Sequence, residues 1–382
     1  MSVKPSTSSL FDPIVFTNGI TLRNRVAMAP MTTWSANPDG TISDQEIAYY
    51  RRRATGVGLV LTGCTHVMDN GIGFTDEFAG HEDRFVPSLR RLAEAAKSGG
   101  AVAILQIFHA GNKANPGLTP NGDVVSASAL NAFTGPFNSG DVVPRALSSD
   151  EVVSVVRAFG QTTRRAIEAG FDGIELHGAH GFLLQNFLSP KFNQRNDEWG
   201  GSLEGRLSFP LAVLREVKRV IDAHAVRPFL VGYRLSPEES GEDGLRLDDT
   251  CTLIDRLIDN GIDYIHASLV DVLRATPLDA ASGRLTASLI VEHVAQRVPV
   301  IAAGQIRTPD QADEALALGL TLVAIGKGLV MNPQWVEQAM QQAPLTTELS
   351  SSDVDDLDIP DNLWMTIQAT TGWFPLRRHA GD

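Results

Sequence analysis

Two histidines that follow a short apolar segment are the residues of this chain best placed to do chemistry. The short, mostly apolar strand 174–176 runs directly into His177, His180 follows after two further residues, and a polar loop rich in Asn, Arg, Asp and Gly continues to Arg206. Imidazoles at the end of a buried strand are held rigidly and can face a cavity, where they donate hydrogen bonds or transfer protons. A single histidine is more often a satisfied core or loop residue, but two at this spacing favour a functional site.

Eight short apolar segments, alternating with eight helix-length amphipathic segments, must position these histidines. Runs rich in Val, Ile, Leu and Ala are typical of strands that are buried on both faces. The predicted strands are 25–29, 58–62, 101–108, 173–176, 229–234, 264–267, 298–303 and 320–325. The predicted helices are 44–53, 86–98, 149–169, 203–222, 248–260, 288–297, 308–318 and 333–342. This alternation predicts an α/β fold of the (β/α)8 TIM barrel type.

A doubly wound sheet is the alternative way to arrange alternating strands and helices. It should show a Gly-x-Gly-x-x-Gly turn after its first strand, and residues 25–34 contain none. Two regions are additional to the eight strand–helix units of a barrel. They are residues 111–144, rich in Gly, Pro, Asn and Ser, and the C-terminal residues 343–382. We expect one barrel domain over residues 1–342, with 111–144 as a capping excursion after the third strand, followed by a linker and tail.

The composition of the chain argues against several classes of partner. A net charge of −13 disfavours nucleic acid and anionic membrane surfaces. No segment approaches the roughly 18 uninterrupted apolar residues of a membrane span, and the N-terminus lacks the pattern of a signal peptide. The two cysteines, Cys64 and Cys251, are far apart, as is usual in a reducing compartment. The sequence therefore predicts a cytoplasmic protein that acts on small molecules.

Glycines and a lysine after the last two predicted strands form a candidate phosphate site. Barrel enzymes carry their chemistry at the C-terminal ends of strands, and here those ends read Gly304-Gln305 and Gly326-Lys327. Glycine lets backbone N–H groups approach a phosphate closely, and the lysine supplies a positive charge. Two such pairs at the expected strand ends predict that a phosphate binds there.

Polar and small residues at the other strand ends are suited to a flat heterocycle. Gln106 offers both a donor and an acceptor, and Arg234 offers fixed donors, for a ring with alternating carbonyl and N–H groups, although Arg234 alone could equally be a salt-bridged barrel arginine. Ala29, Pro30 and Gly63 would provide a platform of small residues. Together with the phosphate site, these residues predict a pocket for a cofactor that resembles a mononucleotide.

The whole set of motifs resembles the old yellow enzyme family, the FMN-dependent ene-reductases. The resemblance rests on the run LFDPIVFTNGITLRNRVAMAPMT, the His-x-x-His loop with its NDEWGGS continuation, the run LVAIGKGLVMNPQW and the order of strand-end residues, and it covers nearly all of the chain. It implies FMN as cofactor, NADPH or NADH as reductant, and a homo-oligomer, either dimer or tetramer. In some relatives the tail reaches a neighbouring subunit's site, which here would involve Trp373, Arg377 or Arg378.

The resemblance also implies a role for each candidate residue. The implied cofactor-binding residues are Ala29, Pro30, Met31, Thr32, Cys64, Gln106, His177, Arg234, Gly304, Gln305, Gly326 and Lys327. Three residues are expected to be catalytic: Thr32 would tune the redox potential of the flavin, and His177 and His180 would bind the carbonyl oxygen of an enone. Trp34 and Phe182 would complete the substrate site with the two histidines.

The implied reaction has two halves, with three departures from the family pattern. NAD(P)H reduces FMN, and the reduced flavin then passes hydride to an activated alkene such as an α,β-unsaturated carbonyl compound. Phe182 stands where the family commonly has a tyrosine that protonates the alkene, so the proton donor is unassigned. Lys327 stands where the family usually has an arginine, so the bidentate hydrogen bonding of a guanidinium group to the phosphate is lost. Trp34 predicts a narrower substrate pocket than in some relatives.

Other functions stay open on the sequence alone. The chain could be a flavoprotein with a different acceptor reaction (a dehydrogenase, a demethylase or a dienoyl thioester reductase), or a non-catalytic flavin-binding barrel, which Phe182 favours. His177 and His180 could start a metal site with His109, although no metal is expected. A sugar-phosphate aldolase or isomerase would need a lysine or glutamate at a strand end, and Lys327 suits phosphate better.

Overall fold

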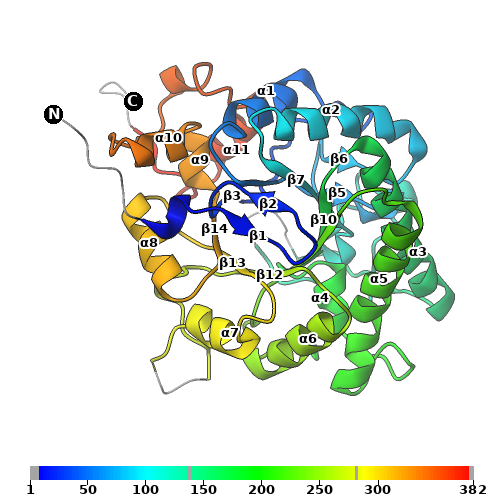
Figure 1. Ribbon diagram of the computed structural model, residues 1–382. Coiled ribbons are helices and arrows are strands. Elements are labelled where there is room, and N and C mark those ends of the chain that lie inside the picture. The colour runs from blue at the N-terminus through cyan, green and yellow to red at the C-terminus, as the bar shows by residue number, and fades with distance from the viewer. Residues whose placement is uncertain (1–7, 136–139, 280–282, 378–382) are drawn as a thin grey trace.

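A closed barrel of eight parallel strands forms the centre of the molecule, and helices surround it (Figure 1). The structure is a computed structural model that describes residues 8–135, 140–279 and 283–377. The barrel strands are, in order, β3 (Val26–Met28), β4 (Leu59–Leu61), β7 (Val102–Phe108), β10 (Gly173–Gly178), β11 (Leu230–Leu235), β12 (Tyr264–Ser268), β13 (Val300–Ala303) and β14 (Leu322–Ile325). Since β14 pairs with β3 and β7 with β10, the sheet closes on itself. The predicted barrel is confirmed, and the doubly wound alternative is wrong.

Each predicted helix is present between or after the barrel strands. They are α1 (Asp44–Arg53), α2 (Val86–Lys97), α3 (Ser149–Ala169), α5 (Leu203–His224), α6 (Leu247–Asp259), α7 (Thr286–Val294), α8 (Pro309–Ala317) and α10 (Trp335–Met340). Ser148 caps α3 in a capping box with Glu151, and Gly170 ends that helix at a φ of 91°. Helix α7 stops earlier than predicted because Ala295 and Gln296 take positive φ values of 50° and 62°.

Within the described residues, nine further α-helices and strands were not predicted, and all of them except α11 span six residues or fewer, too few to show a period. They are the helices α4 (Leu183–Leu188), α9 (Lys327–Met331) and α11 (Asp361–Ala369), and the strands β1 (Ile14–Val15), β2 (Thr21–Leu22), β5 (Thr65–His66), β6 (Phe78–Ala79), β8 (Val125–Ser126) and β9 (Arg145–Ala146). Single-turn 3₁₀ helices lie at Ser9–Phe11, Asp69–Gly71, Asp83–Phe85, Gly111–Lys113, Pro120–Gly122 and Ser351–Asp353. The β1–β2 hairpin crosses the N-terminal end of the barrel (Figure 1).

Side chains inside the barrel form an apolar layer and, nearer the C-terminal strand ends, a polar layer. The apolar layer is continuous with Phe16 and Leu22 of the N-terminal hairpin and includes Tyr264 of β12. Gln106 and His266 lie two residues further along their strands than Ile104 and Tyr264, so alternation turns them inward as well. The sequence of the strands thus fills the bottom of the barrel and leaves polar groups facing its mouth.

The segment predicted to cap the barrel and the C-terminal tail lie against different helices, α4 and α1 respectively. In the described part of the cap, Asn112 N and Ser126 Oγ both donate to Asn186 Oδ1, each at 3.1 Å. In the tail, α11 lies beside α1 (Figure 1), where Gln45 Nε2 donates to Asp361 Oδ2 at 2.8 Å. Among the described residues, no helix has the combination of length and apolarity that crossing a bilayer requires.

Candidate functional site

A cavity of about 380 Å³ opens at the C-terminal ends of the barrel strands, and all but one of the predicted site residues line it. The predicted set was Ala29, Pro30, Met31, Thr32, Trp34, Cys64, Gln106, His177, His180, Phe182, Arg234, Gly304, Gln305, Gly326 and Lys327. One platform residue is misplaced: Gly63 is not in the lining, and its N–H donates to the hydroxyl of Tyr50 at 2.7 Å. The strand-end rule therefore identified one connected site.

His177 ends β10 with its ring almost fully buried beside the cavity. The backbone N–H of Ala179 donates to His177 Nδ1 at 3.3 Å, so a neutral ring must carry its proton on Nε2. The pKa of His177 lies well below its usual value because of burial first and then because of His180 and Arg234. His177 is therefore a neutral hydrogen-bond donor at neutral pH.

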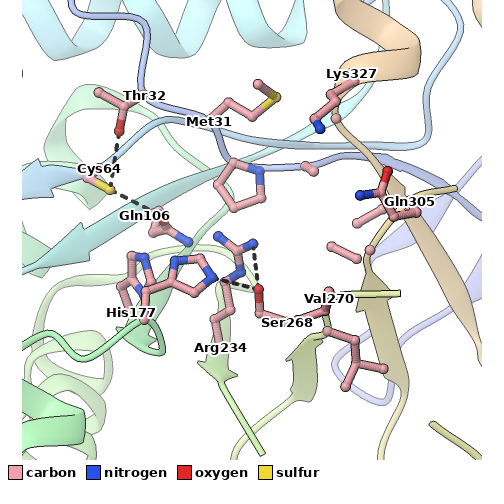
Figure 2. Close-up of a pocket in the computed structure, with 18 of the residues that line it drawn as sticks. Met31, Thr32, Cys64, Gln106, His177, Arg234, Ser268, Val270, Gln305 and Lys327 are labelled. Carbon is pink, nitrogen blue, oxygen red and sulfur yellow. Dashed lines mark hydrogen bonds between the residues drawn. The ribbon is translucent and has the colours of Figure 1, made fainter. Parts of the chain in front are cut away.

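His180 is held by its backbone as well as by its ring. Its φ is 60°, Lys113 Nζ donates to its carbonyl oxygen at 2.6 Å, and its N–H donates to Ser236 Oγ at 3.0 Å. The ring Nε2 lies 2.7 Å from Ser268 Oγ, and that hydroxyl also accepts from Arg234 Nη2 at 3.1 Å. Figure 2 shows Ser268 and Arg234 in this cluster.

The pKa of His180 is also well below its usual value. Desolvation is the main cause, followed by the positive charges of Arg234 and Lys113, although the residue is open to the cavity. Because an exposed ring is less desolvated, the two cations are the firmer reason for the direction. The rings of His177 and His180 meet edge to face, with centroids 5.1 Å apart. Both histidines thus line the cavity with neutral rings, and neither is a ready acid near pH 7.

Arg234 and Gln106 form the polar floor of the cavity. Arg234 is 7% exposed, and its Nε is buried without a partner among the described residues. Cys64 Sγ lies 3.5 Å from Gln106 Oε1 and 3.9 Å from Thr32 Oγ1, which joins three predicted residues in one chain of weak hydrogen bonds (Figure 2). Burial raises the pKa of the Cys64 thiol to about 12, so it is present as a thiol.

Two cations converge at the opposite end of the cavity from the histidines, where Figure 2 places Lys327 and Gln305. Arg307 Nη2 donates to Gln305 Oε1 at 2.8 Å. Arg307 and Lys327 both line the cavity, and the pKa of Lys327 is lowered by burial and then by the charge of Arg307. The sequence reading missed Arg307, although it is only three residues after Gly304 and hence still at a strand end. A guanidinium is thus present here despite the lysine at 327.

Aromatic side chains surround the cavity near the histidines. Phe182 packs edge to face on His177, with centroids 4.8 Å apart, and Trp34 packs on Phe74 at 5.7 Å. Trp373 from the tail packs on Trp34 at 5.9 Å. Phe74 and Trp373 both line the cavity and were not predicted for this pocket.

The tail reaches the site of its own chain. Trp373 contacts Trp34 of the same chain, and its expected reach to a neighbouring subunit's site stays a prediction. The backbone of Arg377 is paired with Leu349 at 2.8 Å, and Arg378 lies outside the described residues. Trp34 has a φ of 51°, a conformation that bulky residues rarely adopt, and Asn362 Nδ2 of α11 donates to its carbonyl oxygen at 2.6 Å. The C-terminal segment therefore holds one wall of the pocket.

His109, the third ligand considered for a metal, is turned away from the other two histidines. Its Nε2 is 3.3 Å from Asn70 Oδ1, and its Nδ1 accepts from the N–H of Gly111 at 3.1 Å. No group of three His, Cys, Asp or Glu side chains that could hold a metal ion occurs in residues 8–135, 140–279 and 283–377. His177 and His180 instead face Ser268 and Phe182.

A buried carboxylate, Glu46 of α1, supports the segment that carries Thr32 and Trp34. Thr33 Oγ1 donates to it, and its Oε2 is buried without a partner among the described residues. Desolvation raises the pKa of Glu46 to about 7, against a usual value of 4.5. Because the pKa of Glu46 is higher in the folded than in the unfolded protein, the protonated carboxyl group stabilises the folded state. This stabilisation is complete below pH 4.5 and is lost as the pH rises through 7.

Replacing Glu46 should therefore change how stability depends on pH. Between pH 5 and pH 8, the wild-type protein should lose about 3 kcal/mol of unfolding free energy relative to the Glu46→Gln variant, because glutamine cannot ionise. Chemical denaturation at several pH values measures this difference, and all other titrating groups cancel in it. A difference that is constant across this range would contradict the raised pKa.

Comparisons with known proteins agree on one family. The NADH:flavin oxidoreductase / NADH oxidase family matches residues 9–346 of the chain. A probable NADH-dependent flavin oxidoreductase of Bacillus subtilis is 42% identical, over 98% of this chain and 100% of that protein. Morphinone reductase is a structural neighbour with a TM-score of 0.75 and 27% identity, covering 90% of this chain and 92% of that one.

Some relatives are much longer proteins. The chain is 38% identical to an NADH:acrylate oxidoreductase of Vibrio harveyi over 94% of its own length but only 36% of the relative's. It is also 38% identical to an NADH:fumarate oxidoreductase of Klebsiella pneumoniae, over 94% of this chain and 39% of that protein. The chain therefore corresponds to little more than a third of these two relatives.

Proposed function

Because the chain belongs to the NADH:flavin oxidoreductase / NADH oxidase family, we propose that it uses FMN and NADH or NADPH to reduce the double bond of an activated alkene. The observation that carries the proposal is the pair of neutral donors, His177 and His180, at the cavity that also holds Arg234 and Gln106. The names of the acrylate, fumarate and morphinone reductases support an alkene conjugated to a carbonyl group. The resemblance to the old yellow enzymes is confirmed at the level of the family.

The residues of the cavity fit FMN. Arg234 has a buried Nε without a partner in the described protein, as a donor for a ring carbonyl requires. Lys327 and Arg307 line the cavity and supply positive charge for a phosphate, and Gly304, with a φ of 154°, has no space for a side chain because a Cβ would meet the carbonyl oxygen of Leu269 at 2.4 Å. We assign the ring to the end with Gln106 and Arg234, and the phosphate to the end with Lys327 and Arg307.

When bound, FMN supplies the redox chemistry by taking hydride from the nicotinamide and giving it to the alkene. The chain orients and polarises the reactants. His177 and His180 donate hydrogen bonds to the carbonyl oxygen of the alkene, which draws electrons from its β carbon. Trp34 and Phe182 restrict the alkene to one orientation, and the aromatic side chains around the cavity exclude water.

Proton delivery to the alkene has no assigned donor, because Phe182 cannot donate. We expect an enone to reoxidise the reduced flavin of the Phe182→Tyr variant about tenfold faster, or more, than that of the wild-type protein. One positioned acid raises a reaction rate by up to about 10²–10⁴-fold. Stopped-flow absorbance at the flavin band measures this rate. Phe182→Leu serves as control, because it changes the packing on His177 without adding a proton. Reoxidation of the tyrosine variant at the wild-type rate would show that water already supplies the proton efficiently.

The purified holoenzyme provides the test of the proposed function. The protein should have the absorbance of an oxidised flavin, lose it with NADH or NADPH under anaerobic conditions, and regain it with an α,β-unsaturated carbonyl compound while a saturated product forms. A protein that NAD(P)H bleaches but that no alkene, thioester or nitroalkene reoxidises would favour a different acceptor or a non-catalytic flavin protein.

A further inference from the structure

A fully buried carboxylate lies directly below the cavity. Glu175 is on β10, two residues before His177, so alternation along the strand turns both side chains into the barrel. The interior layer beneath it is apolar, as is usual in barrels of this type. An ionised group at this depth is unfavourable unless its oxygens are paired.

Two side chains, one from the adjacent strand β7 and one from β12, the next strand but one, pair both oxygens of Glu175. Gln106 Nε2 on β7 donates to Oε1 at 2.7 Å, and His266 Nδ1 on β12 donates to Oε2 at 2.9 Å. Burial alone raises the pKa of Glu175, but His266, Arg234 and Gln106 outweigh it and leave the pKa below its usual value. Burial lowers the pKa of His266, and its Nε2 has no partner in the described protein, so the ring is neutral. The pair therefore carries one negative charge.

This carboxylate decides how Gln106 faces the cavity. A carboxylate can only accept, so Gln106 must turn its NH₂ group to Glu175. Its carbonyl oxygen consequently lies on the side of Cys64, another residue that lines the cavity, 3.5 Å from Sγ. Without Glu175, either end of the amide could face the cavity.

We propose that Glu175 is a positioning residue for FMN, which fixes the amide of Gln106 and lowers the reduction potential of the bound flavin through its buried charge. The proposal rests on the placement of the ring at Gln106 and Arg234 given above. Reduction makes the flavin ring more negative, which the charge of Arg234 favours and the charge of Glu175 opposes. Between charges a few ångströms apart at the edge of a protein interior, such an interaction changes the ratio of reduced to oxidised flavin by about tenfold or more.

The variant Glu175→Gln removes the charge and can keep the hydrogen bonds. Its Oε1 can still accept from Gln106, and its amide can donate to His266 Nδ1 once that ring moves its proton to Nε2. At a fixed potential, we expect the ratio of reduced to oxidised FMN in the holoenzyme to rise about tenfold, which is about 30 mV for a two-electron couple. Equilibration of the holoenzyme with a reference dye under anaerobic conditions measures it.

Glu239 provides a matched control. It is also a buried carboxylate that accepts from a glutamine, Gln185, at 2.7 Å, but neither residue lines the cavity. We expect Glu239→Gln to leave the flavin potential unchanged, and Glu175→Asp, which keeps the charge, to stay closer to the wild-type potential than Glu175→Gln does. A merely structural role for Glu175 would not produce this order.

An unchanged or lower potential in folded Glu175→Gln holoenzyme would overturn the proposal. If that variant does not fold, the double variant Glu175→Gln with His266→Gln carries the same expectation, because the two amides can bond to each other. No alkene is present in the measurement, so a failure of the proposed alkene reduction would leave this result intact.

Discussion

Replacing His177 by leucine is expected to slow the reduction of an enone by about 100- to 1,000-fold, the usual effect of removing a preorganised donor from an oxyanion site. The reason is that the proton on His177 Nε2 is fixed by the backbone N–H of Ala179 on the other ring nitrogen, so the ring is already oriented for an acceptor in the cavity. Single-turnover reoxidation of the prereduced enzyme measures the effect separately from the step with NAD(P)H.

Two variants make this experiment specific. His177→Asn keeps an N–H donor and should recover part of the rate. His293→Asn replaces a histidine of α7 that pairs with Asp255 and does not line the cavity, so it should leave the rate unchanged. The FMN content of each preparation must match that of the wild-type protein. A His177→Leu enzyme that reduces an enone within a few fold of the wild-type rate would remove the histidine pair from the proposed mechanism.

Removing the positive charge of Lys327 is expected to weaken FMN binding by about 10- to 150-fold, since a hydrogen bond to a charged group contributes about 1.5–3 kcal/mol. Arg307→Met should have an effect of similar size. The two side chains are close enough for the pKa of Lys327 to respond to Arg307, so the effects of the two substitutions need not add. Titration of the apoprotein with FMN, followed by flavin fluorescence, gives the dissociation constants.

Riboflavin, which lacks the phosphate, separates charge from folding in this experiment. Its affinity should be nearly the same in the wild-type protein, Lys327→Met and Arg307→Met. Lys327→Arg keeps the charge and should bind FMN within a few fold of the wild-type affinity. If Lys327→Met weakened riboflavin and FMN equally, the phosphate would have to bind elsewhere.

The barrel could be predicted from the sequence because its pattern is local. Each barrel strand is rich in apolar residues, and each major helix shows its own amphipathic period, so no distant contact is needed to recognise them. The candidate site followed from one further rule, that parallel strands of a barrel bring their C-terminal ends to the same face. His177 and Arg234 are 57 positions apart in the chain, yet they are register partners on neighbouring strands.

Residues outside the strand ends, or below them, could not be found in this way. Phe74 lies in the segment between β5 and β6, and Trp373 comes from the tail, where an aromatic residue could as well have packed on a neighbouring subunit. Asn362 holds Trp34 across 328 positions of sequence, a pairing that no local pattern encodes. In the sequence, Glu175 is one polar residue in an otherwise apolar strand. Only the structure shows that Gln106 and His266 both donate hydrogen bonds to it.

The sequence by itself thus determined the barrel and the residues at its mouth, because apolar runs, helical periods and strand ends are properties of neighbouring residues. Only the tertiary structure decided which groups act together: Arg307 with Lys327, the C-terminal tail with Trp34, and Glu175 with Gln106. Such pairings depend on which side chains a closed barrel and a folded-back tail bring within a few ångströms, and that distance is set by the packing of the whole chain.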